Sequence, residues 1–387
     1  MNYLINTVFY YPETNGVSRS VDYRCRYLRQ LGHTVTLVLP EYPGLMEVEQ
    51  AKQLQKLGVR LITVPLAERT EWDDAWFGNY KTLDVVDEQL AKERFDVLMV
   101  DEPMMLFMMT GFRLAMLKNL NQGCQHVAIC HGVLSDLYKH YQLHTAALQV
   151  EALKNDIFGD YDITVLPSQF VQDRYQLCGR VLKVPFLGVD KLTYRPSSND
   201  GHLNGKESDA QRFNVLYVGR IASEKNIELL VQIAQEMHQY GLQDIVWHFV
   251  GTGPLHGKLA EFACEHLRVH GELHGKQLVQ AFQQADVFIT ACDFEAFGLT
   301  VAEAMACGLP VITVDQGGNA EQFDHNVEGL KFNLSQPNTL AEAILTVKND
   351  PKLRCEMGRK AREKVLSWDE ASEELMHRLA AEREFGL

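Results

Sequence analysis

The chain has 387 residues and a formal net charge of −14, with 46% hydrophobic and 23% charged residues. These proportions are typical of a globular protein in water, and the length exceeds what one ordinary hydrophobic core organises, so two domains are expected. The negative charge argues against a general nucleic-acid binder, which needs a basic surface to displace the counterions of the phosphates.

The N-terminus and the hydropathy pattern predict a cytoplasmic protein. The opening residues, MNYLINTVFYYPE, lack a charged segment followed by a long apolar core, so no signal peptide is expected. No apolar run reaches the ~18 residues that a membrane-spanning helix needs. The cysteines form no C-x-x-C pair and are expected to be reduced thiols. Peripheral binding to the inner face of a membrane remains compatible with this pattern.

One cluster, CQHVAICH, holds Cys124, His126, Cys130 and His131. A zinc site is one interpretation, but the spacing does not match the usual pairs of zinc ligands. The same residues have the pattern of a buried strand, which sends neighbouring side chains to opposite faces. The sequence therefore favours a strand here and predicts no metal site.

The first half of the chain alternates short β-rich runs with helical stretches. After the first strand, residues 16–32 place apolar side chains at helical spacing, and residues 144–156 do so again. Near-continuous apolar strands of this kind are typical of parallel sheets covered by helices on both faces. The predicted strands are 2–11, 33–40, 59–66, 95–103, 126–131 and 162–168.

The second half repeats the scheme after a polar segment at residues 195–212, which is rich in Ser, Asn, Asp and Gly and indicates a linker. An amphipathic helix at residues 367–385 closes the chain. Two Rossmann-like α/β domains in tandem are therefore predicted. The strands of the second domain are expected at 213–220, 244–253, 285–292 and 309–315.

Ligands of open α/β sheets bind beyond the carboxyl ends of the strands, so the residues after each strand are the candidates for function. Arg220 and Lys225 follow the 213–220 strand, and Asn226 opens a helix. Two cations beside free helix N–H groups form an anion site. The spacing alone does not distinguish such a site from a solvated basic loop.

Two further loops follow strands of the second domain. FVGTGPLHG supplies Gly251 and Gly253, a weak G-x-G signal that a tight turn explains equally well. DFEAFGLTVAEAMACGLPVI places Glu295 before a predicted helix and Glu303 inside it. The amides of Gly298, Leu299 and Thr300 would point outward at the helix start. A carboxylate that only complements the helix dipole is the alternative for Glu303.

The first strand-to-helix loop, YYPETNGVSRS, contains Gly16, and four arginines follow it at positions 19, 24, 26 and 29. Arg19 and Arg26 are seven residues apart and are expected to share a helix face. One interpretation is a solvated charged face, and the other is contact with acidic lipid headgroups or an anionic acceptor.

These motifs together resemble the retaining glycosyltransferases of family 4, which have the GT-B fold. The resemblance extends over nearly the whole chain, in the right order. It is most specific in EAFGLTVAEAMACGLPV, which fits the family's E-x7-E pattern. The other matching stretches are NGVSRSVDYRCRYLRQLGHTVTLVLP, VPFLGVDKLTYRP, VGRIASEKNIELL and FVGTGPL.

The resemblance implies two Rossmann-like domains that face a central cleft, with a C-terminal helix that crosses back to the N-domain. An acceptor domain is expected at residues 1–190 together with 367–387, and a donor domain at 191–366. Arg220 and Lys225 would hold the diphosphate of a nucleotide-sugar. Further residues implied in donor binding are Gly16, Gly219, Gly251, Gly253, His274, Glu295, Phe297, Gly298, Leu299, Thr300 and Glu303.

Within this set the resemblance assigns different tasks. Glu303 would accept hydrogen bonds from the ribose, and Glu295 would face the transferred sugar. His131 would lie near both the donor sugar and the acceptor, and the backbone around Gly271 and His274 would lie near the base. With Glu295, Lys225, Arg220 and His131 as the catalytic set, a hexosyl group would move with retention by front-face attack. The residues implied at the acceptor or membrane surface are Asn15, Arg19, Arg26, His131 and Tyr138.

The expected donor is UDP- or GDP-linked. No cofactor and no essential divalent metal is expected, because no D-x-D follows a strand and side-chain cations are available. Weaker likeness in NGVSRSV and in DLYKHYQL points to the branch that acts on diacylglycerol or lipid-linked acceptors, and anionic membrane lipids are the corresponding partner. The sequence indicates no oligomeric state.

The chain departs from the family pattern at Ala291-Cys292, where Pro-Ser is common, at Asn319, where a proline is common, and at Gly132, where threonine is common. These departures leave the choice of sugar open. Two other hypotheses remain: the same chemistry on a small soluble acceptor, and a non-catalytic nucleotide-sugar-binding protein. A Rossmann dehydrogenase is disfavoured because no dinucleotide fingerprint is present.

Overall fold

The computed structural model describes residues 1–12, 15–65, 90, 93–110, 123–197 and 212–385. The chain divides into two compact units. One unit contains Met1–Gly188 and Trp368–Leu387, and the other contains Val189–Ser367. The predicted domains were 1–190 with 367–387, and 191–366. Among the described residues, no helix combines the length and the apolar character needed to cross a membrane.

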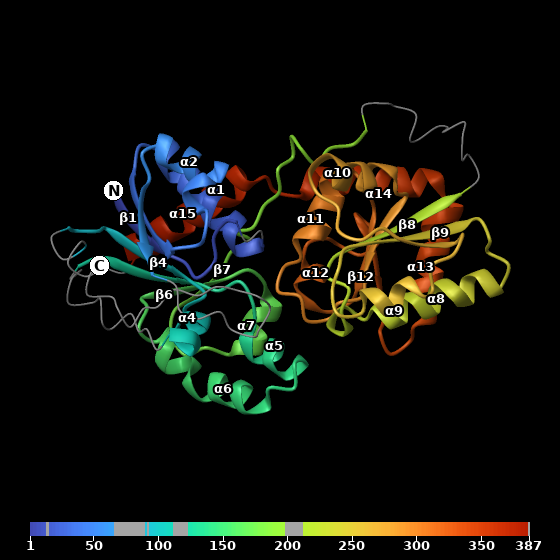
Figure 1. Cartoon of the computed structure of the whole chain (residues 1–387), viewed down its shortest axis with the longest axis horizontal. Helices are drawn as coiled ribbons and strands as arrows, with labels where there is room; N and C mark the ends of the chain where they lie inside the picture. The colour runs from blue at the N-terminus through green and yellow to red at the C-terminus, as the bar shows by residue number, and fades with distance from the viewer. Residues whose placement is uncertain (13–14, 66–89, 91–92, 111–122, 198–211, 386–387) are drawn as a thin grey trace. The chain divides into compact units, whose positions relative to one another are not determined.

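The N-terminal unit is built on a seven-stranded parallel sheet with the strand order β3-β2-β1-β4-β5-β6-β7 (Figure 1). The strand interiors are apolar and buried, which explains why helices cover the sheet. The strands are β1 (Asn2–Asn6), β2 (Thr34–Pro40), β3 (Arg60–Val64), β4 (Val97–Asp101), β5 (Gln125–Ile129), β6 (Ile163–Leu166) and β7 (Val181–Lys183). The helices are α1 (Gly16–Gln30), η1 (Leu45–Glu47), α2 (Glu49–Lys56), α4 (Pro103–Thr110), α5 (Leu134–His140), α6 (His144–Phe158) and α7 (Gln169–Tyr175).

The last helix, α15 (Trp368–Phe385), belongs to this first unit and packs against α1 (Figure 1). The Trp368 ring stacks on the Tyr23 ring, with centroids 4.9 Å apart and an interplanar angle of 7°. Ala371, Leu375 and Leu379 follow on the same buried stripe, at the four-residue spacing of one helix face. The end of the chain therefore completes the core of the unit in which the chain begins.

The C-terminal unit has a six-stranded parallel sheet with the order β10-β9-β8-β11-β12-β13. Its strands are β8 (Phe213–Val218), β9 (Ile245–Val250), β10 (Leu267–Val269), β11 (Val287–Thr290), β12 (Val311–Val314) and β13 (Gly329–Phe332). Its helices are η5 (Ser223–Lys225), α8 (Ile227–Gln239), α9 (His256–Ala260), α10 (Gly275–Gln284), α11 (Leu299–Ala306), α12 (Gly317–Glu321), α13 (Asn338–Asn349) and α14 (Pro351–Lys364).

The two sheets confirm the predicted fold class of tandem Rossmann-like α/β domains. The predicted strands are present, but several are shorter than expected because their last residues already belong to loops. Three strands were missed: β7, β10 and β13, each of three or four residues and each at the edge of its sheet. Edge strands are short and partly exposed, so they lack the continuous apolar pattern that marked the central strands.

In each sheet the strand order reverses beside the strand that comes first in the chain. In the N-terminal sheet β1 lies between β2 and β4, and in the C-terminal sheet β8 lies between β9 and β11. The loops that leave the carboxyl ends of such neighbouring strands diverge and leave room for a ligand. Of the predicted site residues, His131 follows β5, Gly219 and Arg220 follow β8, and Gly251 and Gly253 follow β9. Arg26, Tyr138 and Glu303 lie further along the helices α1, α5 and α11.

We expect Trp368→Ala to lower the free energy of unfolding of the N-terminal unit by ~3–5 kcal/mol, because a buried aromatic ring is lost and a cavity remains. Chemical denaturation monitored by circular dichroism measures the change. Leu148→Ala is the control, since this side chain is 71% exposed and its loss should change stability by less than ~0.5 kcal/mol. Equal stability of the two variants would contradict the packing role of Trp368.

Candidate functional site

An ion pair joins two strand-end loops of the C-terminal unit. Lys225 Nζ lies 2.5 Å from Glu295 Oε2 and 3.7 Å from Cys292 Sγ. The Lys225 side chain is 20% exposed and that of Glu295 is 33% exposed, so solvent and ligands reach both. Burial lowers the pKa of Lys225, but the Glu295 carboxylate outweighs it and the pKa is raised overall. Lys225 is therefore a fixed cation at neutral pH.

The glycines after β8 and β9 let two loops approach each other. Gly251 has φ +135°, and a Cβ there would lie 2.0 Å from the Gly219 carbonyl oxygen. The Gly251 N–H donates to the Gly271 carbonyl at 2.7 Å, and the Ile221 N–H donates to the Thr252 carbonyl at 2.8 Å. A side chain at position 251 would force these loops apart. The G-x-G signal thus marks close backbone packing between neighbouring strand ends.

Arg220 follows directly on Gly219. The Tyr217 hydroxyl donates to the Arg220 carbonyl at 2.8 Å, which fixes the backbone of this loop. The Arg220 Nε lies 3.9 Å from the Glu224 carboxylate, and the Arg220 side chain is about one-third exposed. The second predicted cation therefore lies on the same strand-to-helix connection as Lys225, since η5 ends at Lys225.

Helix α11 begins beside Glu295. Gly298 is its N-cap residue and has φ +85°, and a Cβ there would lie 1.8 Å from Asn319 Oδ1. The N–H groups at the start of such a helix have no acceptor within the helix, and they attract negative charge. Phe297, Leu299 and Thr300 are partly exposed around this end.

Glu303 and His274 lie in opposite environments. Glu303 is in the second turn of α11 and is buried, so it is not an ordinary surface charge. His274 is the N-cap residue of α10, its side chain is 78% exposed, and it lies 3.6 Å from Glu272. The structure thus places Glu303 in the interior of the unit and His274 at its surface.

The N-terminal unit carries a second cluster of charged groups, at the ends of β4 and β5. Arg24 on α1 donates to both oxygens of Asp101, at 2.8 and 3.2 Å. His131 Nε2 lies 2.7 Å from Asp101 Oδ1. Arg24 and Asp101 are almost completely buried. The Arg24 guanidinium holds the pKa of Asp101 below its usual value despite burial, which alone would raise it.

His131 is oriented by three neighbours. Its backbone N–H donates to Glu102 Oε1 at 2.5 Å, its Nε2 faces Asp101, and its ring meets the Phe186 ring edge-on at 5.0 Å. Burial lowers the pKa of His131 more than Asp101 raises it, so the imidazole is neutral at pH 7. A neutral ring that donates from Nε2 to Asp101 keeps its lone pair on Nδ1, and in the described part of the chain Nδ1 has no hydrogen-bond partner.

Glu102 holds the turn that follows β5. Its buried carboxylate accepts from the backbone N–H groups of His131 and Gly132. Glu102 itself has φ +54°, an unusual conformation for a residue with a side chain. Burial raises the pKa of Glu102 to about 8, although the His131 N–H lowers it. Asp101 and Glu102 were not predicted as site residues, although the acidic pair directly after an apolar strand was a signal for them.

The structure corrects the expectation of an arginine-rich exposed face on α1. Arg24 is buried against Asp101, because it lies on the same stripe as Val17, Cys25 and Leu28. Arg26 and Arg29 also bond within the unit. Arg26 Nε pairs with Asp22 at 2.6 Å, and Arg29 donates to the Leu57 and His33 carbonyls.

Two more residues predicted at the acceptor or membrane surface have structural tasks. Asn15 caps α1, since its Oδ1 accepts from the Ser18 N–H at 2.9 Å and the Ser18 hydroxyl oxygen accepts from the Asn15 N–H. Tyr138 is buried on α5, so its ring does not form a surface. Arg19 is partly exposed in the first turns of α1, and Gly16 is the first residue of that helix.

The Cys124 and His126 side chains contact each other, with Sγ and Nε2 3.3 Å apart, and His126 Nδ1 lies 3.2 Å from Asp162. Both residues adjoin or belong to β5, as the predicted strand implied. Within the described ranges no group of three or more His, Cys, Asp or Glu side chains is placed to hold a metal ion.

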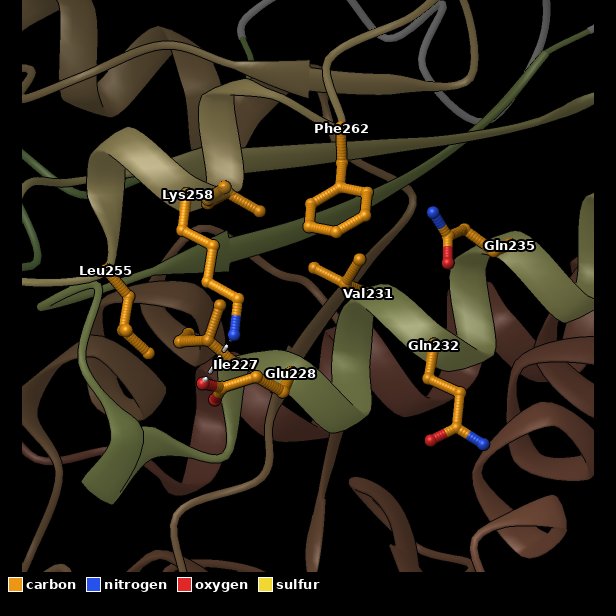
Figure 2. Close-up of a pocket in the computed structure, with 9 residues that line it drawn as sticks. Ile227, Glu228, Val231, Gln232, Gln235, Leu255, Lys258 and Phe262 are labelled. Atoms are coloured by element: carbon orange, nitrogen blue, oxygen red, sulfur yellow. Dashed lines mark ion pairs between the residues drawn. The ribbon is translucent and has the colours of Figure 1, made fainter.

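A separate hollow lies between α8 and α9 on the C-terminal unit (Figure 2). Its walls are mainly apolar, with Phe262 at one side and the Glu228–Lys258 ion pair, 3.8 Å apart, at the other. None of its lining residues belongs to the predicted donor site. The hollow lies between two helices, whereas Gly219, Arg220, Gly251 and Glu295 lie on loops that follow strands of the C-terminal sheet.

Comparison with known proteins places both units in one class. Residues 14–189 match the family described as Glycosyltransferase Family 4, and residues 202–364 match the family described as Glycosyl transferases group 1. Since the two matches together span both units, the chain belongs to the family 4 glycosyltransferases of the GT-B fold.

Individual relatives share less than a third of their aligned residues with this chain. The chain is 29% identical over 324 residues to a GDP-mannose-dependent alpha-mannosyltransferase of Mycolicibacterium smegmatis. This alignment covers 79% of this chain and 78% of that protein. It is 28% identical over 218 residues to the sulfoquinovosyl transferase SQD2 of Arabidopsis thaliana. That second alignment covers 54% of this chain but only 42% of the plant protein.

Solved structures share the fold. A sucrose-phosphate synthase from Thermosynechococcus elongatus matches over the full length of both chains, with a TM-score of 0.77 at 20% identity. HepE from Anabaena, solved in complex with UDP and glucose, matches 98% of this chain and 100% of its own, with a TM-score of 0.72 at 17% identity.

The raised pKa of Glu102 predicts how stability depends on pH. In the folded protein this carboxyl titrates near pH 8, against an ordinary value of 4.5. Between these values the folded state holds more protons than the unfolded state, so the free energy of unfolding falls as the pH rises, by up to ~1.4 kcal/mol per pH unit. Glu102→Gln removes this titration. The free energy of unfolding of the variant, relative to that of the wild-type protein, should therefore rise between about pH 6 and about pH 8.

Thermal and chemical denaturation across this pH range provide the measurement. Glu41→Gln, which changes an exposed glutamate of the same unit, is the control and should follow the wild-type pH profile. A Glu102→Gln profile parallel to wild type would show that the buried carboxyl does not titrate in this window.

Proposed function

We propose that the chain transfers a hexosyl group from a nucleotide-sugar to a hydroxyl of a lipid, a lipid-linked acceptor or a glycan, with retention at the anomeric carbon. The observation that carries the proposal is the arrangement in the C-terminal unit. The Lys225–Glu295 pair, the Arg220 loop and the start of α11 all lie at strand-end connections of one parallel sheet.

This arrangement suits a leaving group that gains negative charge. As the glycosidic bond breaks, charge accumulates on the nucleoside diphosphate. Lys225 and Arg220 would stabilise that charge more strongly than they stabilise the intact donor, which is the condition for lowering the barrier. Glu295 would turn to the hydroxyls of the transferred sugar once the diphosphate replaces it beside Lys225.

Retention would follow from attack on the same face that the leaving group departs from. The leaving phosphate would take the proton of the acceptor hydroxyl, so no general base is needed. For His131 to contact a sugar hydroxyl, its buried Nδ1 would have to become accessible, while Asp101 fixes the position of Nε2. Glu303 would accept hydrogen bonds from the ribose hydroxyls. Because its carboxylate is buried, the ribose would have to reach it from the start of α11.

The donor is proposed to be UDP- or GDP-linked. The names of a GDP-mannose-dependent relative and of a structural neighbour solved with UDP and glucose support both bases equally. We propose that the reaction requires no divalent metal, with Lys225 and Arg220 supplying the positive charge at the diphosphate. The protein would work in the cytoplasm, at the inner face of a membrane where the acceptor is a lipid.

The same chemistry on a small soluble acceptor is the second candidate. It is favoured by the α1 arginines, since Arg24, Arg26 and Arg29 all bond within their own unit and leave less positive charge for a lipid surface. A name among the relatives, sulfoquinovosyl transferase, supports a lipid acceptor. The acceptor class therefore needs its own experiment.

Donor binding is tested first by thermal shift with UDP-glucose, GDP-mannose and ADP-glucose. We expect a UDP- or GDP-linked sugar to raise the unfolding temperature, because a ligand that binds only the folded state stabilises it by RT ln(1 + [L]/Kd). A protein with no response to any of the three sugars at millimolar concentration would argue against the proposed function.

Lys225→Ala should lower kcat/KM for donor turnover by on the order of 10²-fold or more, because it removes a preorganised cation from the developing charge. Steady-state release of nucleoside diphosphate gives the measurement. Lys258→Ala is the matched control, since this lysine also pairs with a glutamate but lies at the α8–α9 hollow. If Lys225→Ala keeps near wild-type kcat/KM, the assigned role of Lys225 is wrong.

Sedimentation with vesicles of phosphatidylcholine and phosphatidylglycerol separates the two acceptor classes. An enzyme for lipid acceptors should bind the anionic vesicles at low salt and be released as salt is raised, because the contacts are electrostatic. Turnover with a soluble sugar phosphate or inositol phosphate, without vesicle binding, would select the second candidate.

A further inference from the structure

The loop at residues 291–298 carries Glu295 and leads from β11 into α11. Its geometry decides where the Glu295 carboxylate and the first N–H groups of α11 point. The carbonyl groups of such a loop lie outside the sheet, and buried backbone groups need partners. The Ala291 carbonyl accepts from the Asn226 side chain. Further partners come from one short segment, residues 317–322, which begins with α12.

Three donors of this segment hold the loop. The Gly318 N–H donates to the Glu295 carbonyl at 2.6 Å. The Asn319 side-chain Nδ2 donates to the Cys292 carbonyl at 3.4 Å. The Gln322 Nε2 donates to the Gly298 carbonyl at 3.0 Å and also to the Phe297 carbonyl.

The direction of these bonds has a consequence for the opposite side of the loop. In a trans peptide the C=O and the following N–H point in opposite directions. When Gln322 draws the Phe297 and Gly298 carbonyls toward itself, the N–H groups of Gly298 and Leu299 must point away from residues 317–322. The segment therefore sets the direction in which α11 offers its first donors.

The contact is too close for larger residues. A Cβ at Gly318 would lie 1.9 Å from the Ala296 carbonyl oxygen, and a Cβ at Gly298 would lie 1.8 Å from Asn319 Oδ1. Asn319 is 2% exposed, and its buried Oδ1 has no hydrogen-bond partner among the residues that the structure describes. The Asn319 side chain donates a hydrogen bond, but its buried oxygen accepts none, and this costs stability. The cost indicates that Asn319 has a role at the loop other than stabilising the fold.

Asn319 also connects two positions at which the chain departs from the family pattern. Its Nδ2 contacts the carbonyl of Cys292, and the Cys292 thiol lies 3.7 Å from Lys225 Nζ. Cys292 and Asn319, two of the positions that depart from the family pattern, are thus neighbours in space. Cys292 in turn lies beside the Lys225–Glu295 pair.

We propose that Asn319 and Gln322 are positioning residues for the transferred sugar: they fix residues 291–298 so that Glu295 and the first amides of α11 meet the hexose. This inference rests on the proposed function, since it assigns the same site a further pair of residues. Both side chains bond to carbonyls of the loop that carries Glu295, whereas the diphosphate is assigned to Lys225 and Arg220. The proposal therefore predicts a larger effect on sugar transfer than on nucleotide binding.

The test uses Gln322→Met, which keeps the length of the side chain and removes its donor, and Asn319→Ala. Gln316→Met is the matched control, because Gln316 is exposed and its side chain makes no capping bond to α12. Turnover of UDP-glucose or GDP-mannose, whichever the wild-type protein uses, is compared with the Kd of UDP or GDP alone.

For Gln322→Met and Asn319→Ala we expect kcat to fall by about 10- to 100-fold, as a misplacement of about 1 Å costs up to this much. The Kd of the nucleoside diphosphate should change by less than about threefold, and Gln316→Met should match wild type in both. Equal loss of diphosphate affinity and of kcat, or no loss of kcat, would overturn the positioning role.

Hydrogen–deuterium exchange on the folded protein gives a second readout that does not depend on activity. Amides of residues 292–299 should exchange faster in Gln322→Met than in Gln316→Met, while the α13 amides stay unchanged. Unaltered exchange in this loop would overturn the inference even in an active enzyme. If wild type turns over no nucleotide-sugar but the loop loosens as expected, the proposed function fails while the structural coupling stands.

Discussion

A parallel sheet delivers all of its strand-to-helix loops to one edge, and the backbone groups of those loops need hydrogen-bond partners that the sheet does not provide. In the C-terminal unit the loops satisfy one another. The Gly251 N–H reaches the Gly271 carbonyl, the Ile221 N–H reaches the Thr252 carbonyl, and the Asn226 side chain donates to the Ala291 carbonyl at 2.8 Å. Glycines at the contact points allow this approach. The site is therefore a network of mutually bonded loops in which each loop fixes its neighbour.

The two units each contain an ion pair at the strand ends, and the two pairs differ in their exposure to solvent. In the N-terminal unit Arg24 and Asp101 are both almost inaccessible, and each satisfies the other, so this pair organises the interior and orients His131. Breaking such a pair by removing one partner leaves an uncompensated charge and costs ~3–5 kcal/mol. Lys225 and Glu295 are partly exposed instead. An incoming anion can therefore reach Lys225, whereas the Arg24–Asp101 pair is closed to solvent.

Much of the fold follows from the sequence, because long apolar strands alternate with helical spacing. The central strands and the tandem domains were predicted, whereas β7, β10 and β13 were not, since three or four partly exposed residues at a sheet edge carry too little pattern. Boundaries failed for another reason: the predicted strands ran on into the loops that follow, as at residues 7–11 after β1 and at Gly219 and Arg220 after β8.

Side-chain partners were harder to predict than elements. Arg24 was treated as one of four similar arginines, yet its spacing from Val17 and Leu28 places it on the buried stripe of α1. A cation at such a position requires a buried anion, and Asp101 at the end of β4 supplies it. That pairing joins residues far apart in the sequence, so no local pattern contains it. The same holds for Gln322 and the loop that it supports.

The residues that the family pattern identifies are mainly those that would touch the ligand, and the structure adds the residues that hold them. Glu295 and Gly298 stand out in the sequence, but their orientation depends on Gly318, Asn319 and Gln322, which match no ligand-binding motif. His131 likewise depends on Asp101 and Glu102. In both units the supporting groups follow a neighbouring strand of the same sheet. Strand order therefore determines which loop supports which, and a change in a supporting loop can alter the geometry of a site whose ligand-contacting residues are all retained.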